Sequence, residues 1–155
     1  MQDDESLKYI KHLYNGEYNK NGSIFTINKK PFCDDTTILY GHNMKNRTMF
    51  SELDKYMDGK FLDEHPSIEI YTENQNYRAI VFSCYSIGIS TEEKNIKCLD
   101  FKEEIEYYKK KSSHLVNDVG EIEKILKLST CSYLNNCTIP TNQRYYIIAK
   151  LEKMN

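Results

Sequence analysis

The chain has 155 residues and a formal net charge of −2, and 39% of its residues are hydrophobic and 12% aromatic. This size fits a single domain over residues 1–155, which can bury a core without disulfides or a bound metal. The near-neutral charge argues against a nucleic-acid partner, because nucleic-acid-binding surfaces are strongly basic. The acidic start is not typical of a signal peptide, and no apolar run approaches the ~20 residues that span a bilayer, so we expect a soluble chain as written.

The first half of the sequence predicts short helices and strands in alternation. Residues 5–13 and 48–57 carry apolar side chains at helical spacing, and Gly59 ends the second of these segments. Runs of alternating, β-branched and aromatic residues predict strands at residues 23–28, 36–42, 67–72 and 78–89, the last two joined by a turn at 73–76.

The second half predicts one well-defined helix and two further strands. Asp100 is followed three residues later by Glu103, which is the spacing of a capping box, and the helix is expected to run to Lys111. Residues 122–131 and 143–153 are predicted strands. Together these elements predict a mostly antiparallel β-sheet or barrel with inserted helices.

Three residues of types that often take part in catalysis lie at the ends of predicted strands, where active sites are commonly built. His42 ends one predicted strand, Cys131 ends another, and Arg144 begins the last. The alternation places Cys131 on the face of its strand that also carries Lys127 and Ser129, away from the most apolar positions. Periodicity alone favours the plainer interpretation of an exposed histidine, a half-buried thiol and a surface arginine.

The sequence has five cysteines, and their spacing includes no Cys-x-x-Cys pair of the kind that zinc or thioredoxin-like sites use. A free nucleophilic thiol is one interpretation. Another is a secreted adhesin in which the cysteines form disulfides, for example Cys84 with Cys98. Alkylation of a free thiol at Cys131 would argue against the adhesin.

Three segments, in this order, resemble the histidine, cysteine and arginine motifs of class B sortases. The matching segments are Leu39-Tyr40-Gly41-His42-Asn43-Met44 with residues 49–53, Leu128-Ser129-Thr130-Cys131-Ser132-Tyr133, and Arg144 with residues 145–151. Residues 14–18 and 22–25 and the helix beginning at Asp100 also match. The resemblance runs from about residue 5 to the end, and it implies a sortase-like antiparallel β-barrel with inserted helices.

The resemblance also implies a reaction. Sortases are cysteine transpeptidases of Gram-positive bacteria that cut a Pro-x-Thr sorting signal after Thr and join it to an amine. Cys131 would be the nucleophile, His42 the general acid and later the base, and Arg144 a donor to the oxyanion or the substrate backbone. No metal or organic cofactor is implied.

The expected partners are surface proteins that bear C-terminal sorting signals, together with a peptidoglycan cross-bridge or a pilin amine as the acceptor. The family works on the extracellular face of the cell membrane. By position in the motifs, the substrate-binding residues would be Ser6, Ile10, Tyr40, Ser129 and Ser132.

The sequence departs from the family pattern at three places. Lys127 stands where the family's Thr-Leu-Ser-Thr-Cys signature begins with Thr, and the connection from Cys131 to Arg144 is longer than is common. Family members also carry a membrane anchor, a helix and a first strand before the segment that matches residue 5, so we expect an N-terminally shortened chain. Its open sheet edge would favour self-association, and the alternative function is therefore a weakly active or inactive protein that binds sorting-signal peptides or self-associates.

Overall fold

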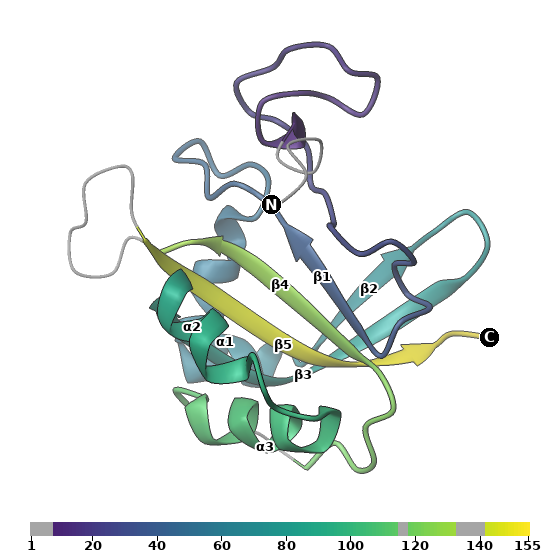
Figure 1. Cartoon of the computed structure of the whole chain (residues 1–155), viewed down its shortest axis with the longest axis vertical. Helices are drawn as coiled ribbons and strands as arrows, with labels where there is room; N and C mark the ends of the chain where they lie inside the picture. Colours follow the sequence, from purple (N-terminus) through teal and green to yellow (C-terminus); the bar gives the residue numbers. More distant parts are fainter. Residues whose placement is uncertain (1–7, 115–117, 133–141) are drawn as a thin grey trace.

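A computed structural model describes residues 8–114, 118–132 and 142–155, and its centre is a curled five-stranded sheet (Figure 1). In spatial order the strands are β1 (Thr36–Tyr40), β4 (Ile125–Cys131), β5 (Gln143–Lys153), β3 (Asn76–Gly88) and β2 (Ser67–Tyr71). The pairs β4–β5, β5–β3 and β3–β2 are antiparallel, as expected, whereas β1 and β4 are parallel. The prediction of a mostly β fold with inserted helices is confirmed. The outer strands are β1 and β2, and self-association through either stays a prediction.

The helices lie between the strands in sequence. They are η1 (Lys8–Ile10), η2 (Ser51–Met57), α1 (Gly59–Glu64), α2 (Ile89–Ile96) and α3 (Phe101–Lys111). The capping box of α3 is present: the Asp100 side chain accepts from the backbone N–H of Glu103, and the Glu103 side chain accepts from that of Asp100. None of the helices in the described ranges is long and apolar enough to cross a membrane.

Two predicted elements differ from the structure, and one observed helix was not predicted. Residues 23–28 do not form a strand, because Phe25 alone pairs with β1, in an isolated bridge to Tyr40. Within residues 8–13, the predicted first helix is a single 3₁₀ turn. Helix α2 was not predicted, since its first residues continue the β-branched pattern of the long strand before it.

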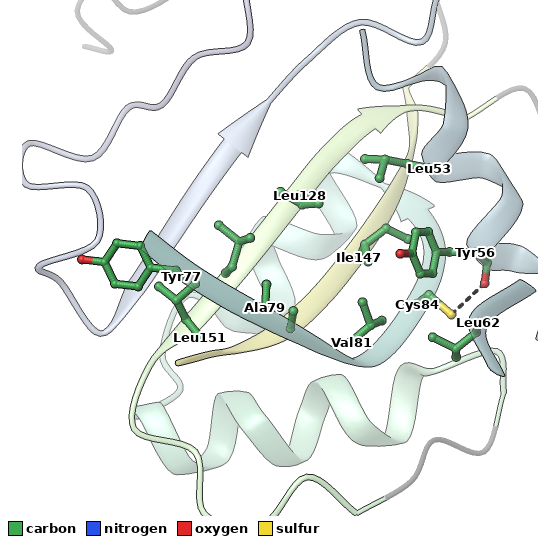
Figure 2. Packing of buried hydrophobic residues seen from close by; sticks show 12 residues of the cluster. Leu53, Tyr56, Leu62, Tyr77, Ala79, Val81, Cys84, Leu128, Ile147 and Leu151 are labelled. Atoms are coloured by element: carbon green, nitrogen blue, oxygen red, sulfur yellow. Dashed lines mark hydrogen bonds between the residues drawn. The ribbon is translucent and has the colours of Figure 1, made fainter. Parts of the chain in front are cut away.

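Each face of the sheet has its own apolar core. η2 and α1 cover one face, where Figure 2 shows side chains of the helices packed against those of the strands. Helix α3 covers the other face, where Ile105 and Tyr108 contact residues of β3, β4 and β5. Both faces of β4 are therefore buried, including the face that carries Lys127 and Ser129.

The cysteines that the structure describes are all free thiols. Cys84 is buried in the first core, where its Sγ lies 3.0 Å from the carbonyl oxygen of Tyr56 (Figure 2). Burial raises the pKa of the Cys84 thiol to about 11, so this thiol stays protonated and unreactive near neutral pH. Cys98 is an exposed free thiol, and the considered Cys84–Cys98 disulfide is wrong because neither cysteine is bonded to another.

Candidate active site

The sheet topology brings His42, Cys131 and Arg144 to one end of the sheet. β1 and β4 are parallel with Tyr40 opposite Ser129, so both strands end on the same side. β5 runs antiparallel to β4 and begins there, with Arg144 directly opposite Cys131. The ends of two parallel strands and the start of an antiparallel neighbour necessarily meet at one edge.

These three side chains line one small cavity of about 150 Å³. Three of the predicted substrate-binding residues, Ile10, Tyr40 and Ser129, line it as well. The remaining lining residues, which sequence reasoning did not assign to the site, are Phe25, Gly41 and Thr130. The sequence showed Phe25 as part of a predicted strand and of the matching residues 22–25, but gave it no role at the site. Its ring stacks on Tyr40 with ring centroids 5.5 Å apart.

One predicted substrate-binding residue that the structure describes, Ser132, does not line this cavity. Ser132 is fully buried, and the hydroxyl of Ser86 on β3 lies 3.0 Å from its hydroxyl, so Ser132 ties the end of β4 to the sheet. Ser6 lies outside the described residues.

The half-buried His42 has a defined orientation. Its Nε2 lies 2.7 Å from the carbonyl oxygen of Ile10. Because a carbonyl can only accept, Nε2 carries the hydrogen and donates it, and in the neutral ring Nδ1 then holds the lone pair. The contact with the N-terminal segment therefore fixes which ring nitrogen can exchange a proton.

Cys131 is a half-buried free thiol at the last position of β4. Its carbonyl oxygen accepts a hydrogen bond from Asn43 Nδ2 at 2.9 Å. Arg144 is half-buried at the start of β5, and its Nη1 donates to the carbonyl of Gln143 at 3.0 Å. The site thus places a free thiol, an imidazole ring and a permanent cation around one cavity.

Tyr40 supplies a neutral hydroxyl to the same cavity. Burial, assisted by the negative charge of Glu93, raises the pKa of the Tyr40 phenol. The phenol therefore stays protonated at neutral pH and can donate a hydrogen bond. Within the described residues, no cluster of three or more His, Cys, Asp or Glu side chains could hold a metal ion.

Gly41 is a tight position beside His42. A Cβ on Gly41 would lie 2.7 Å from Cδ2 of Phe50, whose backbone N–H donates to the His42 carbonyl. We expect Gly41→Ala to lower the free energy of unfolding by about 1–3 kcal/mol, because the Phe50 ring must move. Urea unfolding measures this effect.

Gly88→Ala is the matched control, since its nearest contact would be an ordinary 3.6 Å to Gln143. We expect it to change stability by less than about 1 kcal/mol. Equal losses in the two variants would contradict the steric argument.

Comparison with known proteins gives the class of this fold and site. The family model of the sortase domain matches residues 5–152. The chain therefore belongs to the sortase family.

Similar proteins identify the class within that family. Sortase B of Listeria monocytogenes is 34% identical over 137 residues, which cover 84% of this chain and 56% of that protein, so the chain spans about half of this relative's length. A solved structure of Clostridium perfringens sortase B superimposes with a TM-score of 0.79 at 27% identity and covers 94% of this chain and 81% of that one. A Staphylococcus aureus sortase B–substrate complex gives a TM-score of 0.78 at 25% identity over 96% of this chain and 70% of that one. The resemblance to class B sortases is confirmed.

Proposed function

We propose that this protein is a cysteine transpeptidase that cleaves a Pro-x-Thr-type sorting signal after Thr and transfers the new carboxyl end to an amine. The single observation that carries the proposal is the arrangement of His42, Cys131 and Arg144 around one cavity. Family membership supports it, because sortases as a family perform this class of reaction. The donors would be surface proteins with C-terminal sorting signals, and the acceptor a peptidoglycan cross-bridge or pilin amine outside the cell membrane.

The acylation half-reaction would proceed as follows. The Cys131 thiolate attacks the Thr carbonyl carbon and forms a C–S bond, and the carbonyl oxygen becomes an oxyanion. Arg144 donates hydrogen bonds to this oxyanion or to the neighbouring substrate backbone. His42 gives its proton to the leaving amine as the C–N bond breaks, which leaves a thioester on Cys131.

The transfer half-reaction reverses these roles. The neutral His42 accepts a proton from the incoming amine through Nδ1, the nitrogen that the Ile10 contact leaves with a lone pair. The amine attacks the thioester carbon, a new amide bond forms, and the Cys131 thiolate is released. No step requires a metal or an organic cofactor.

The rest of the cavity suits an extended peptide. Phe25 and Ile10 offer apolar contact, while Tyr40 and Ser129 offer hydroxyl groups. The solved Staphylococcus aureus sortase B–substrate complex, which this chain resembles in fold, supports peptide binding at the family level. We therefore include Ile10, Tyr40 and Ser129 in the proposed substrate site.

Peptide cleavage tests the proposal. A fluorogenic peptide containing Asn-Pro-x-Thr should be cut by the parent protein, and Cys131→Ala should reduce the rate to the background without enzyme, because no other residue replaces the thiolate. An added primary amine should appear joined to the Thr carboxyl in the mass spectrum of the product.

Cys98→Ala is the matched control, since Cys98 is an exposed free thiol outside the site, and we expect it to keep the parent rate. Background-level signal from the parent itself would overturn the enzymatic proposal. Saturable peptide binding without cleavage would instead support the alternative of a peptide-binding sortase-like protein.

A further inference from the structure

The parallel ladder between β1 and β4 ends between the two predicted catalytic segments. Its last backbone rung is the bond from the N–H of Gly41 to the carbonyl of Ser129, at 3.2 Å. Rungs of a parallel ladder from one strand recur every second residue. The next donor along this path would be the backbone of residue 43, and the next acceptor on β4 is the carbonyl of Cys131.

The Cys131 carbonyl accepts its hydrogen bond from a side chain instead of from the backbone of residue 43. Nδ2 of Asn43 donates to the Cys131 carbonyl at 2.9 Å, and Asn43 is buried, with only 9% of its surface exposed. The carboxamide therefore extends the ladder by one rung after the β1 backbone has turned away. Asparagine is suited to this task because its short amide carries an N–H donor like that of the main chain.

His42 lies between these two rungs. Gly41 is tied to Ser129 on one side and Asn43 to Cys131 on the other. The opposite edge of the segment is also held, because the Phe50 N–H donates to the His42 carbonyl and Asn43 pairs with Met49. His42 is thus held beside the cysteine strand through the bonds of its two neighbours, Gly41 and Asn43.

We propose that Asn43 is a positioning residue, whose carboxamide sets the placement of His42 relative to Cys131 through the Cys131 carbonyl. It acts through these two residues and not on the substrate. The proposal rests on the proposed transpeptidase function, in which Cys131 attacks the Thr carbonyl carbon and His42 gives a proton to the nitrogen bonded to that carbon, so the two side chains must lie at one peptide bond. Misplacement of catalytic groups by about 1 Å can cost a factor of ~10² in rate.

The chain provides a matched control at the other end of β1. The carboxamide of Asn28 also binds main-chain atoms of this strand: Oδ1 accepts from the N–H of Ile38 at 2.8 Å, and Nδ2 donates to the carbonyl of Thr36 at 2.9 Å. Asn28 thus supports the same strand with the same chemistry, but away from the cavity. A general loss of strand stability would appear in variants of both Asn28 and Asn43, whereas a positioning effect would appear only in variants of Asn43.

The test compares Asn43→Asp, Asn43→Ala and Asn28→Ala in the full chain. Asn43→Asp keeps the shape of the side chain and turns a carboxylate oxygen toward the carbonyl it should bind. We expect both Asn43 variants to lose about tenfold to a hundredfold in kcat with little change in KM, since no substrate contact is removed. We expect Asn28→Ala to lower the urea midpoint while kcat stays near the parent value.

A second readout does not require turnover. The rate at which iodoacetamide alkylates Cys131, followed by peptide mass mapping as a function of pH, reports the coupling between the thiol and the His42 ring. We expect the Asn43 variants to shift this pH profile and Asn28→Ala to leave it unchanged. An Asn43→Asp protein with the parent kcat and the parent alkylation profile would overturn the proposal, as would an equal loss in Asn28→Ala. If the parent does not cleave peptide, the proposed function fails while the alkylation profile still decides the role of Asn43.

Discussion

Replacing Lys127 with methionine is expected to lower the free energy of unfolding by about 3–5 kcal/mol, because the change leaves a buried carboxylate without its cation. Nζ of Lys127 lies 2.5 Å from Oε1 of Glu92, and the two side chains are only 3% and 2% exposed. Burial lowers the pKa of Lys127, and the negative charge of Glu92 opposes that shift. Urea unfolding of the single variant measures the loss.

The pair is stabilised by a cage of tyrosines. The hydroxyls of Tyr85 and Tyr107 donate to the two oxygens of Glu92, at 2.6 and 2.8 Å. The ammonium group of Lys127 lies 4.5 and 4.8 Å from the ring centroids of Tyr146 and Tyr108, within cation–π range. With Lys127 removed, these hydroxyls still serve the Glu92 carboxylate, but its charge remains buried and uncompensated.

A double variant distinguishes the effect of losing the whole ion pair from the effect of leaving one charge unpaired. Replacing both Glu92 and Lys127 with methionine removes both charges, and we expect it to be more stable than Lys127→Met alone. Lys60→Met is the matched control, because Lys60 and Glu64 form an ion pair at 3.8 Å with side chains 81% and 58% exposed. Such surface pairs contribute about 0–1 kcal/mol. A Lys127→Met loss no larger than this control would contradict the argument.

The Lys127–Glu92 pair also lies next to a residue of the candidate site. Lys127 and Ser129 are on the same face of β4, and Tyr146 stands opposite Ser129 on β5. The Ser129 and Tyr146 hydroxyls are hydrogen-bonded, and burial raises the pKa of Tyr146. The buried Lys127–Glu92 pair therefore adjoins Ser129, a residue of the proposed substrate site, on the same face of β4.

Local features were the ones that the sequence could predict. The helix from Asp100 to Lys111 carries its own start signal, and the last strand was predicted with its observed bounds, residues 143–153. Helix α2 was missed because its role depends on distant partners. Glu92, an acidic residue in a sequence that locally continues a strand, is buried against Lys127 of β4 and two tyrosine hydroxyls, which a local pattern does not reveal.

For the candidate site, the sequence predicted which residues would be present but not that they would meet. Strand periodicity placed His42, Cys131 and Arg144 at strand ends, which the structure shows to be one edge of the sheet. Their convergence could not be derived locally, because it requires β1 to pair in parallel with a strand that follows almost ninety residues later. The Asn43–Cys131 bond joins residues 88 positions apart and was likewise beyond a local pattern.

Replacing Arg144 with lysine is expected to lower kcat for the Asn-Pro-x-Thr peptide by about 10²–10³-fold, nearly as much as Arg144→Ala. Arg144 faces Cys131 across the β4–β5 ladder and lines the same cavity. Its planar guanidinium can donate to the Gln143 carbonyl and still present further N–H groups to the substrate. A lysine ammonium keeps the charge but lacks the paired, fixed donors that an oxyanion site needs.

The division between kcat and KM separates the two proposed roles of Arg144. A loss confined to kcat indicates stabilisation of the oxyanion in the transition state, whereas a rise in KM alone indicates a grip on the substrate backbone. Arg78→Lys is the matched control, since Arg78 lies on β3 in an exposed 3.7 Å pair with Glu69 away from the cavity, and it should keep the parent kinetics. Parent-like kcat and KM in Arg144→Lys would show that charge alone suffices at this position. The planar geometry of arginine would then have no part in the reaction.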